Sequence, residues 1–292
     1  MRTNVSDLLV TAIAPAVWGS TYIVTTEFLP NFSPMTVAML RALPAGLLLL
    51  LFARQLPRGI WWARILLLGA LNISFFLSML FISAYRLPGG VAATVASTQP
   101  LMVVFLAYAI LASPIRMVSV LAALVGAAGV ALLVLTPSAA LDATGIIAGL
   151  AGAAAMACGT VLSRKWQPPV SLLAFTAWQL TAGGLLLVPV VLVFEPAIPV
   201  PTMSNLLGLT WLGLVGAALT YVLWFRGITR LAPSVVSTLL LLSPVTAVLL
   251  GWLLLGQMLT ALQIAGVLFV IGSIWLGQRT NPHLDRQKGK CA

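Results

Sequence analysis

The stretch Ala84-Tyr85-Arg86-Leu87, followed by Pro100, recurs 144 residues later as Ile228-Thr229-Arg230-Leu231, followed by Pro244. In each case the arginine ends one hydrophobic run and the proline lies near the middle of the next. Hydrophobic helices can resemble one another by chance. A single offset that preserves both an Arg-Leu pair and a proline nevertheless favours an internal repeat.

Two shorter matches support the repeat. Trp18-Gly19-Ser20 resembles Cys158-Gly159-Thr160, and Ala45-Gly46-Leu47 resembles Gly183-Gly184-Leu185 with a small gap. The sequence therefore predicts two related halves and a basic tail, with boundaries at 1–138, 139–278 and 279–292.

The composition excludes an ordinary soluble protein. Of the 292 residues, 61% are hydrophobic and 7% are charged, and the mean hydropathy is +1.11. Soluble domains carry about 25% charged residues, because their surfaces must face water. The net charge of +10 does not indicate nucleic-acid binding, since the Lys and Arg residues are scattered at the ends of hydrophobic runs. The lipid bilayer is the expected surroundings of this chain.

Hydrophobic runs bounded by Pro, Gly and charged residues predict an all-α integral membrane fold. We expect ten membrane-spanning helices, near residues 7–29, 34–53, 65–86, 89–112, 115–135, 145–163, 170–193, 205–228, 233–255 and 261–278. Because each half then holds an odd number of spans, the two halves insert in opposite directions. Inverted repeats of this kind are typical of secondary transporters, whose substrate site lies at the midplane between the repeats.

The distribution of basic residues predicts the orientation. With the N-terminus in the cytoplasm, only Arg86 falls outside and Arg41 lies within a span. The remaining Lys and Arg residues fall on the cytoplasmic side: Arg2, Arg54, Arg58, Arg64, Arg116, Arg164, Lys165, Arg226, Arg230, Arg279, Arg286, Lys288 and Lys290. This asymmetry follows the positive-inside rule and places both termini in the cytoplasm, in the inner membrane of a bacterium. Trp61 and Trp62 precede the third span, where interfacial aromatic anchors belong.

Several motifs together resemble a known family. They are Trp18-Gly19-Ser20-Thr21-Tyr22, Ser33-Pro34, Leu40-Arg41-Ala42, and the small residues that lead to Pro100 and to Ser243-Pro244. Over about residues 8–278 the chain resembles the drug/metabolite transporter superfamily, in its ten-span EamA-type group of metabolite and amino-acid exporters. It departs from the family at Gly256-Gln257, where Gly-Glu is frequent. The resemblance implies a central cavity lined by the third, fourth, eighth and ninth spans.

Polar and aromatic side chains mark candidate substrate-binding faces. Thr11, Pro15, Trp18, Tyr22 and Thr25 are spaced by three or four residues and share one face of the first span. Other spans contribute Ser78 and Tyr85, Trp178 and Gln179, and Tyr221 and Trp224. Aromatic rings of this kind could form an adaptable wall that also attracts cations. The alternative is ordinary helix packing.

Arg41 is the single charged residue that we place deep in a span, about 10 Å below the outer boundary. An arginine near a helix centre costs about 2.5–3.5 kcal/mol on insertion scales, so a partner is expected. Two interpretations stay open. Arg41 binds a substrate carboxylate or a carbonyl on an unwound segment, or it pairs structurally with Glu27 or extends outward to water.

The predicted spans lack Asp, Glu and His near mid-membrane, which excludes an intramembrane acid–base or metal-dependent enzyme and a metal or other cofactor. It also predicts transport without proton coupling through a buried carboxylate. Pro100 and Pro244 are candidate hinges or packing kinks.

We expect a monomer or homodimer that exports small metabolites by alternating access, with amino acids, including apolar and aromatic ones, as the favoured class. The alternatives are other organic solutes or drugs, and phosphorylated or nucleotide-linked sugars. Amino acids are favoured mainly by the family resemblance.

Overall fold

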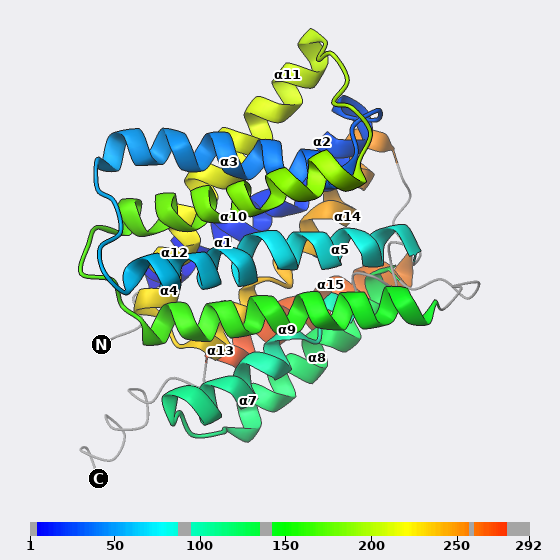
Figure 1. Cartoon of the computed structure of the whole chain (residues 1–292). Coiled ribbons are helices and arrows are strands. Elements are labelled where there is room, and N and C mark those ends of the chain that lie inside the picture. The colour runs from blue at the N-terminus through cyan, green and yellow to red at the C-terminus, as the bar shows by residue number, and fades with distance from the viewer. Residues whose placement is uncertain (1–4, 87–94, 135–141, 257–259, 279–292) are drawn as a thin grey trace.

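The computed structural model describes residues 5–86, 95–134, 142–256 and 260–278 (Figure 1). Within these ranges the chain is helical and contains no strand. Seven helical stretches of the described residues, several of them made of consecutive helices, are long and apolar enough to cross a membrane, and three shorter apolar helices accompany them. The all-helical membrane fold is therefore as predicted.

In the first half, the helices of the described ranges are α1 (Val5–Gly19), α2 (Thr21–Phe28), α3 (Pro34–Ala53), α4 (Trp61–Gly69), the π-helix η1 (Ala70–Ser74), α5 (Phe75–Arg86), α7 (Gln99–Leu111) and α8 (Met117–Val134). In the second half they are α9 (Ala143–Lys165), α10 (Leu172–Phe194), α11 (Met203–Thr210), the π-helix η2 (Trp211–Leu219), α12 (Thr220–Arg230), α13 (Pro233–Leu239), α14 (Leu242–Leu255) and α15 (Ala261–Gln278).

The regular helices are interrupted at corresponding places in the two halves. The third predicted span contains η1 and the eighth contains η2. The two π-helices are equivalent in the repeat, because the offset of 144 carries residues 70–74 onto positions within η2. A π-helix widens the turn and displaces backbone carbonyls from the α-helical ladder. The third and eighth predicted spans are therefore irregular at corresponding places.

Pro100 and Pro244 occupy equivalent positions, although not in the middle of a continuous helix. Each lies in the first turn of a helix, α7 or α14, that follows a short turn. A proline is well tolerated in a first turn, because the missing N–H has no helical partner there. The turns are closed by bonds between residues three apart, such as Ser243 N to Leu240 O at 3.0 Å.

Helices of one half pack mainly against helices of the other. The most extensive contacts join α3 to α10 and α15 to α8. In the repeat, α1 corresponds to α9, α5 to α12 and α7 to α14. Equivalent contacts occur in both directions: α9 packs against α5 and α7, and α1 packs against α12 and α14. Figure 1 shows α3 and α10 side by side and running in opposite directions. The core thus lies between the halves.

The α3–α10 contact depends on two glycines that the sequence repeat pairs. A Cβ at Gly46 would lie 2.7 Å from Thr181 Oγ1 on α10, and one at Gly184 would lie 2.6 Å from Leu43 Cβ on α3. The two helices therefore meet through reciprocal glycine contacts. Small residues allow helix backbones to approach closely where hydrocarbon supplies no other driving force.

We predict that Gly184→Ala destabilises the protein by about 1–3 kcal/mol, because the added methyl group overpacks Leu43. The midpoint of thermal unfolding in detergent measures this. Gly272→Ala is the matched control, since a Cβ there has nothing within 4 Å. Equal midpoints for the two variants would contradict the reciprocal contact.

Candidate substrate site

The carbonyl of Gly216, in the π-helix η2, is the centre of a buried polar cluster. It accepts hydrogen bonds from Arg41 Nη2 at 3.0 Å, Trp18 Nε1 at 3.0 Å and Thr220 Oγ1 at 2.8 Å. Trp18 Nε1 also lies 2.9 Å from Thr220 Oγ1. The donors come from α1, α3 and α12, so the cluster joins both halves. It gives Trp18 and Arg41 a shared partner, which the sequence did not identify.

Arg41 has unused hydrogen-bonding capacity in this cluster. Its side chain is 7% exposed, its Nη2 binds Gly216, and its Nε is buried without a partner. Of the partners left open for Arg41, the structure shows a carbonyl on an irregular segment, while the ion pairs among the described residues involve Asp7 and Asp142 and not Glu27. A buried guanidinium held by one carbonyl keeps its charge uncompensated, and a planar carboxylate suits its remaining donors.

Aromatic rings extend from this cluster. The Trp18 ring lies 5.2 Å from Tyr221 and 5.3 Å from Trp224, measured between centroids. Further ring contacts lead through Phe225 and Phe175 to Trp61. Tyr221 and Trp224 are almost fully buried. The rings thus fill the space between helices in this conformation, and a substrate passing here would have to displace them.

A second polar cluster occupies the equivalent place in the repeat. Asn72 Nδ2, in the π-helix η1, donates to Gln179 Oε1 at 2.8 Å and to Ser163 Oγ at 3.3 Å. The repeat offset of 144 makes Asn72 equivalent to Gly216. Arg41 and Gln179 are also equivalent, because the repeat matches Ala45 with Gly183 and each of the two polar residues lies four positions before its member of that pair. The first cluster therefore contains a guanidinium where the second contains a neutral amide. Gln179 Nε2 is buried and has no partner.

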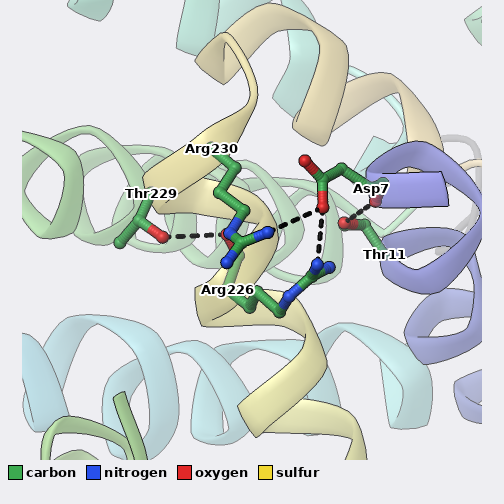
Figure 2. A network of polar contacts seen from close by, with 5 residues as sticks. All are labelled: Asp7, Thr11, Arg226, Thr229 and Arg230. Atoms are coloured by element: carbon green, nitrogen blue, oxygen red, sulfur yellow. Dashed lines mark hydrogen bonds and ion pairs between the residues drawn. The ribbon is translucent and has the colours of Figure 1, made fainter. Parts of the chain in front are cut away.

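An ion-pair network joins the first and eighth predicted spans at one end of the bundle (Figure 2). Asp7 Oδ1 accepts from Arg226 Nη2 at 2.6 Å and from Arg230 Nη1 at 3.1 Å. Thr11 Oγ1 donates to the Asp7 carbonyl at 2.6 Å, and Thr229 Oγ1 to the Arg226 carbonyl at 2.9 Å. Asp7 is 15% and Arg226 25% exposed, whereas Arg230 is 51% exposed, so the Asp7–Arg226 contact is the better shielded of the two. It fastens the beginning of α1 to the end of α12.

A looser ion pair joins the third and sixth predicted spans. Arg86 Nη1 lies 3.9 Å from Asp142 Oδ2, with side chains 55% and 40% exposed. Arg86 is the repeat counterpart of Arg230, and Asp142 precedes α9 much as Asp7 begins α1. Corresponding helix pairs are thus tightly linked by Asp7 and weakly linked by Asp142.

The other predicted site residues fall in different places. Trp178 donates its indole N–H to the Gln55 carbonyl at 2.7 Å, outside the Arg41 cluster. Ser78 is half-buried on α5. The side chains of Tyr22 and Tyr85 lie outside the described residues. Thr220 and Gly216 were missed, because a small residue in an apolar run gives no signal of its role.

Comparison with known proteins agrees with this architecture. Residues 6–135 and 143–277 each match the EamA-like transporter family. The chain belongs to the EamA-like transporter family. Protein PecM of Dickeya dadantii is 43% identical over 279 residues, covering 95% of this chain and 94% of PecM. The Escherichia coli uncharacterized inner membrane transporter YedA is 26% identical, covering 91% and 89% of the two chains.

A solved crystal structure has the same fold as this EamA-like chain. The TM-score is 0.80 at 21% identity, over 93% of this chain and 97% of the other. The family and its relatives identify a multi-pass membrane transporter rather than an enzyme. The resemblance inferred from the sequence motifs is therefore confirmed.

We predict that Asp7→Asn lowers the free energy of unfolding by about 1–3 kcal/mol, because two arginines lose their charged acceptor. Asp142→Asn is the control. Its ion pair is exposed, and asparagine can replace aspartate as the N-cap that accepts from Gly145 N. Thermal unfolding in detergent should separate the two variants, and an equal loss for both would contradict the asymmetry.

Proposed function

We propose that this EamA-like transporter exports small metabolites by alternating access, with amino acids, including apolar and aromatic ones, as the favoured substrates. The single observation that carries the substrate class is the buried Arg41 guanidinium, with an unpartnered Nε beside a cluster of aromatic rings. A carboxylate fits the cation, and an apolar side chain fits the rings. Drugs and other organic solutes are the alternative.

Phosphorylated or nucleotide-linked sugars fit the site less well. Their charge calls for several cationic side chains, whereas Gln179 occupies the position equivalent to Arg41 in the second half. The described carboxylates, on Asp7, Glu27, Asp142 and Glu195, lie at or near helix ends. Transport without proton coupling is therefore part of the proposal.

The proposed architecture is ten spans in two inverted halves, 1–138 and 139–278, followed by the tail 279–292. It is supported by the reciprocal contact of α3 with α10, by the paired π-helices and by the matched turns before Pro100 and Pro244. The two family matches have nearly the same boundaries. We place the protein in the bacterial inner membrane with both termini in the cytoplasm, as a monomer or homodimer.

The two ion-pair sites are the proposed gates. The Asp7 network would close the cytoplasmic end between α1 and α12, while the Arg86–Asp142 pair would be the outer counterpart. In this proposal, the short contact at Asp7 and the long one at Asp142 belong to a conformation closed toward the cytoplasm. Rocking one half against the other would exchange these two states.

Transport in proteoliposomes tests the proposal. A panel of radiolabelled amino acids should be exchanged with and without a pH gradient, each compared with its carboxamide, which keeps the side chain but lacks the charge. We expect carboxylate-dependent transport that the pH gradient does not drive. Proton movement in step with substrate would contradict uncoupled transport, and equal transport of acids and amides would contradict recognition of the carboxylate.

We predict that Arg41→Ala lowers transport of the carboxylate substrates by about tenfold or more, and that of the carboxamides much less, because a charge-assisted hydrogen bond is lost. Arg41→Lys keeps the charge and should retain part of the activity. The amount of folded protein in the membrane is measured alongside. An equal loss for acids and amides at normal protein levels would show that Arg41 is structural.

A further inference from the structure

A cavity of about 1050 Å³ lies away from the Arg41 cluster, at one end of the bundle. It is lined mainly by the segment between α3 and α4 and by the segment between α9 and α10. Both segments are on the predicted cytoplasmic side. The side chains that give the cavity its chemistry are Arg54, Arg58, Trp61, Trp62, Ser171 and Trp178.

The cavity is basic and has no counter-charge. None of its lining residues is acidic. Arg54 and Arg58 are exposed, and neither takes part in an ion pair among the described residues. Two guanidinium groups four residues apart therefore face an open space with their donors available. Arginine presents its donors as a planar fork that matches the oxygens of a phosphate.

The segment that bears the two arginines has a defined backbone. Arg54 ends α3 in the left-handed conformation, at φ 49°, and its N–H binds the Leu50 carbonyl at 2.9 Å. Pro57 is buried, and Gly59 also has a positive φ, of 55°. A preorganised segment loses less conformational entropy when a ligand binds.

Tryptophans form the floor and rim of the cavity. Trp178 is 4% exposed, and its indole is fixed on the Gln55 carbonyl, which lies in the arginine segment. Trp62 is 58% exposed at the rim. Tryptophan is enriched where a bilayer meets water, at the level of the lipid headgroups. The cavity is therefore at the right depth for a headgroup.

Exposed apolar side chains neighbour the arginines in the sequence, and one of them, Leu56, lines the cavity. Leu51, Phe52 and Leu56 are 72%, 70% and 60% exposed. In a membrane protein such side chains contact acyl chains, so the cavity borders on the lipid as well as on water. A free anion would make no use of this apolar border, whereas a phospholipid would use both the border and the arginines.

We propose that this cavity is a binding site for an anionic phospholipid, whose phosphate is held by Arg54 and Arg58 and whose acyl chains lie along Leu51 and Phe52. Basic pockets between helices on the cytoplasmic side are suited to anionic headgroups. The site is separate from the Arg41 cluster. Lipid bound there would hold the end of α3 and the beginning of α4 against α10.

Binding to the purified, delipidated full-length protein tests this site. Phosphatidylglycerol, phosphatidylcholine and inorganic phosphate are each titrated, with native mass spectrometry counting bound lipid and thermal unfolding reporting stabilisation. We expect saturable binding and stabilisation by phosphatidylglycerol only. Equal binding of phosphatidylcholine would overturn the requirement for anionic charge, and equal stabilisation by inorganic phosphate would assign a free anion instead of a lipid.

Variants locate the site. Arg54→Gln and Arg58→Gln should each weaken phosphatidylglycerol binding by about tenfold, the loss of one charge-assisted contact. Arg116→Gln removes one basic charge from the same predicted side, away from the cavity, and should bind as wild type does. Arg54→Lys keeps the charge without the planar fork and should give an intermediate affinity. Wild-type affinity in the Arg54→Gln, Arg58→Gln double variant would overturn the proposal.

Discussion

A hydrocarbon environment offers no hydrogen-bond partner, so each backbone carbonyl freed from a helix must be satisfied by the protein itself. Side chains also gather on one carbonyl within a helix, since Trp18, Arg41 and Thr220, from three helices, converge on the Gly216 carbonyl in η2. This carbonyl gives Arg41 one hydrogen-bond partner within a span, although it does not compensate the charge. It also brings α1, α3 and α12 to a common point and assembles the aromatic rings around it.

The repeat supplies two such points, and divergence has made them different. The η1 cluster consists of the neutral side chains of Asn72 and Gln179. The η2 cluster instead pairs the charged Arg41 with a backbone carbonyl, that of Gly216. The same divergence separates the ion pairs at the helix ends, which are tight at Asp7 and loose at Asp142. Each cluster takes side chains or carbonyls from both halves, and the charged member, Arg41, is present in only one of the two clusters.

The sequence predicted the helices well, because hydrophobic length and turn residues are local properties. It also paired Gly46 with Gly184, and the structure places them at reciprocal positions of the α3–α10 contact, against Thr181 and Leu43. It left several partners open for Arg41, among them a carbonyl on an unwound segment and Glu27, and it could not single out Gly216, which lies 175 residues away on a π-helix. A short π-helix does not change the hydrophobic pattern enough to be recognised in a sequence. Residue type alone also could not show that Trp178 lies outside the Arg41 cluster.

The central claim is that the two halves are inverted relative to each other. Equivalent loops must then lie on opposite sides of the membrane, so single cysteines at Asn31 and Gln167, in a background with Cys158→Ser and Cys291→Ser, test it directly. A membrane-impermeant maleimide applied to intact cells should label the Asn31→Cys variant, and should label the Gln167→Cys variant only after permeabilisation. Labelling of both from the same side would contradict the inversion.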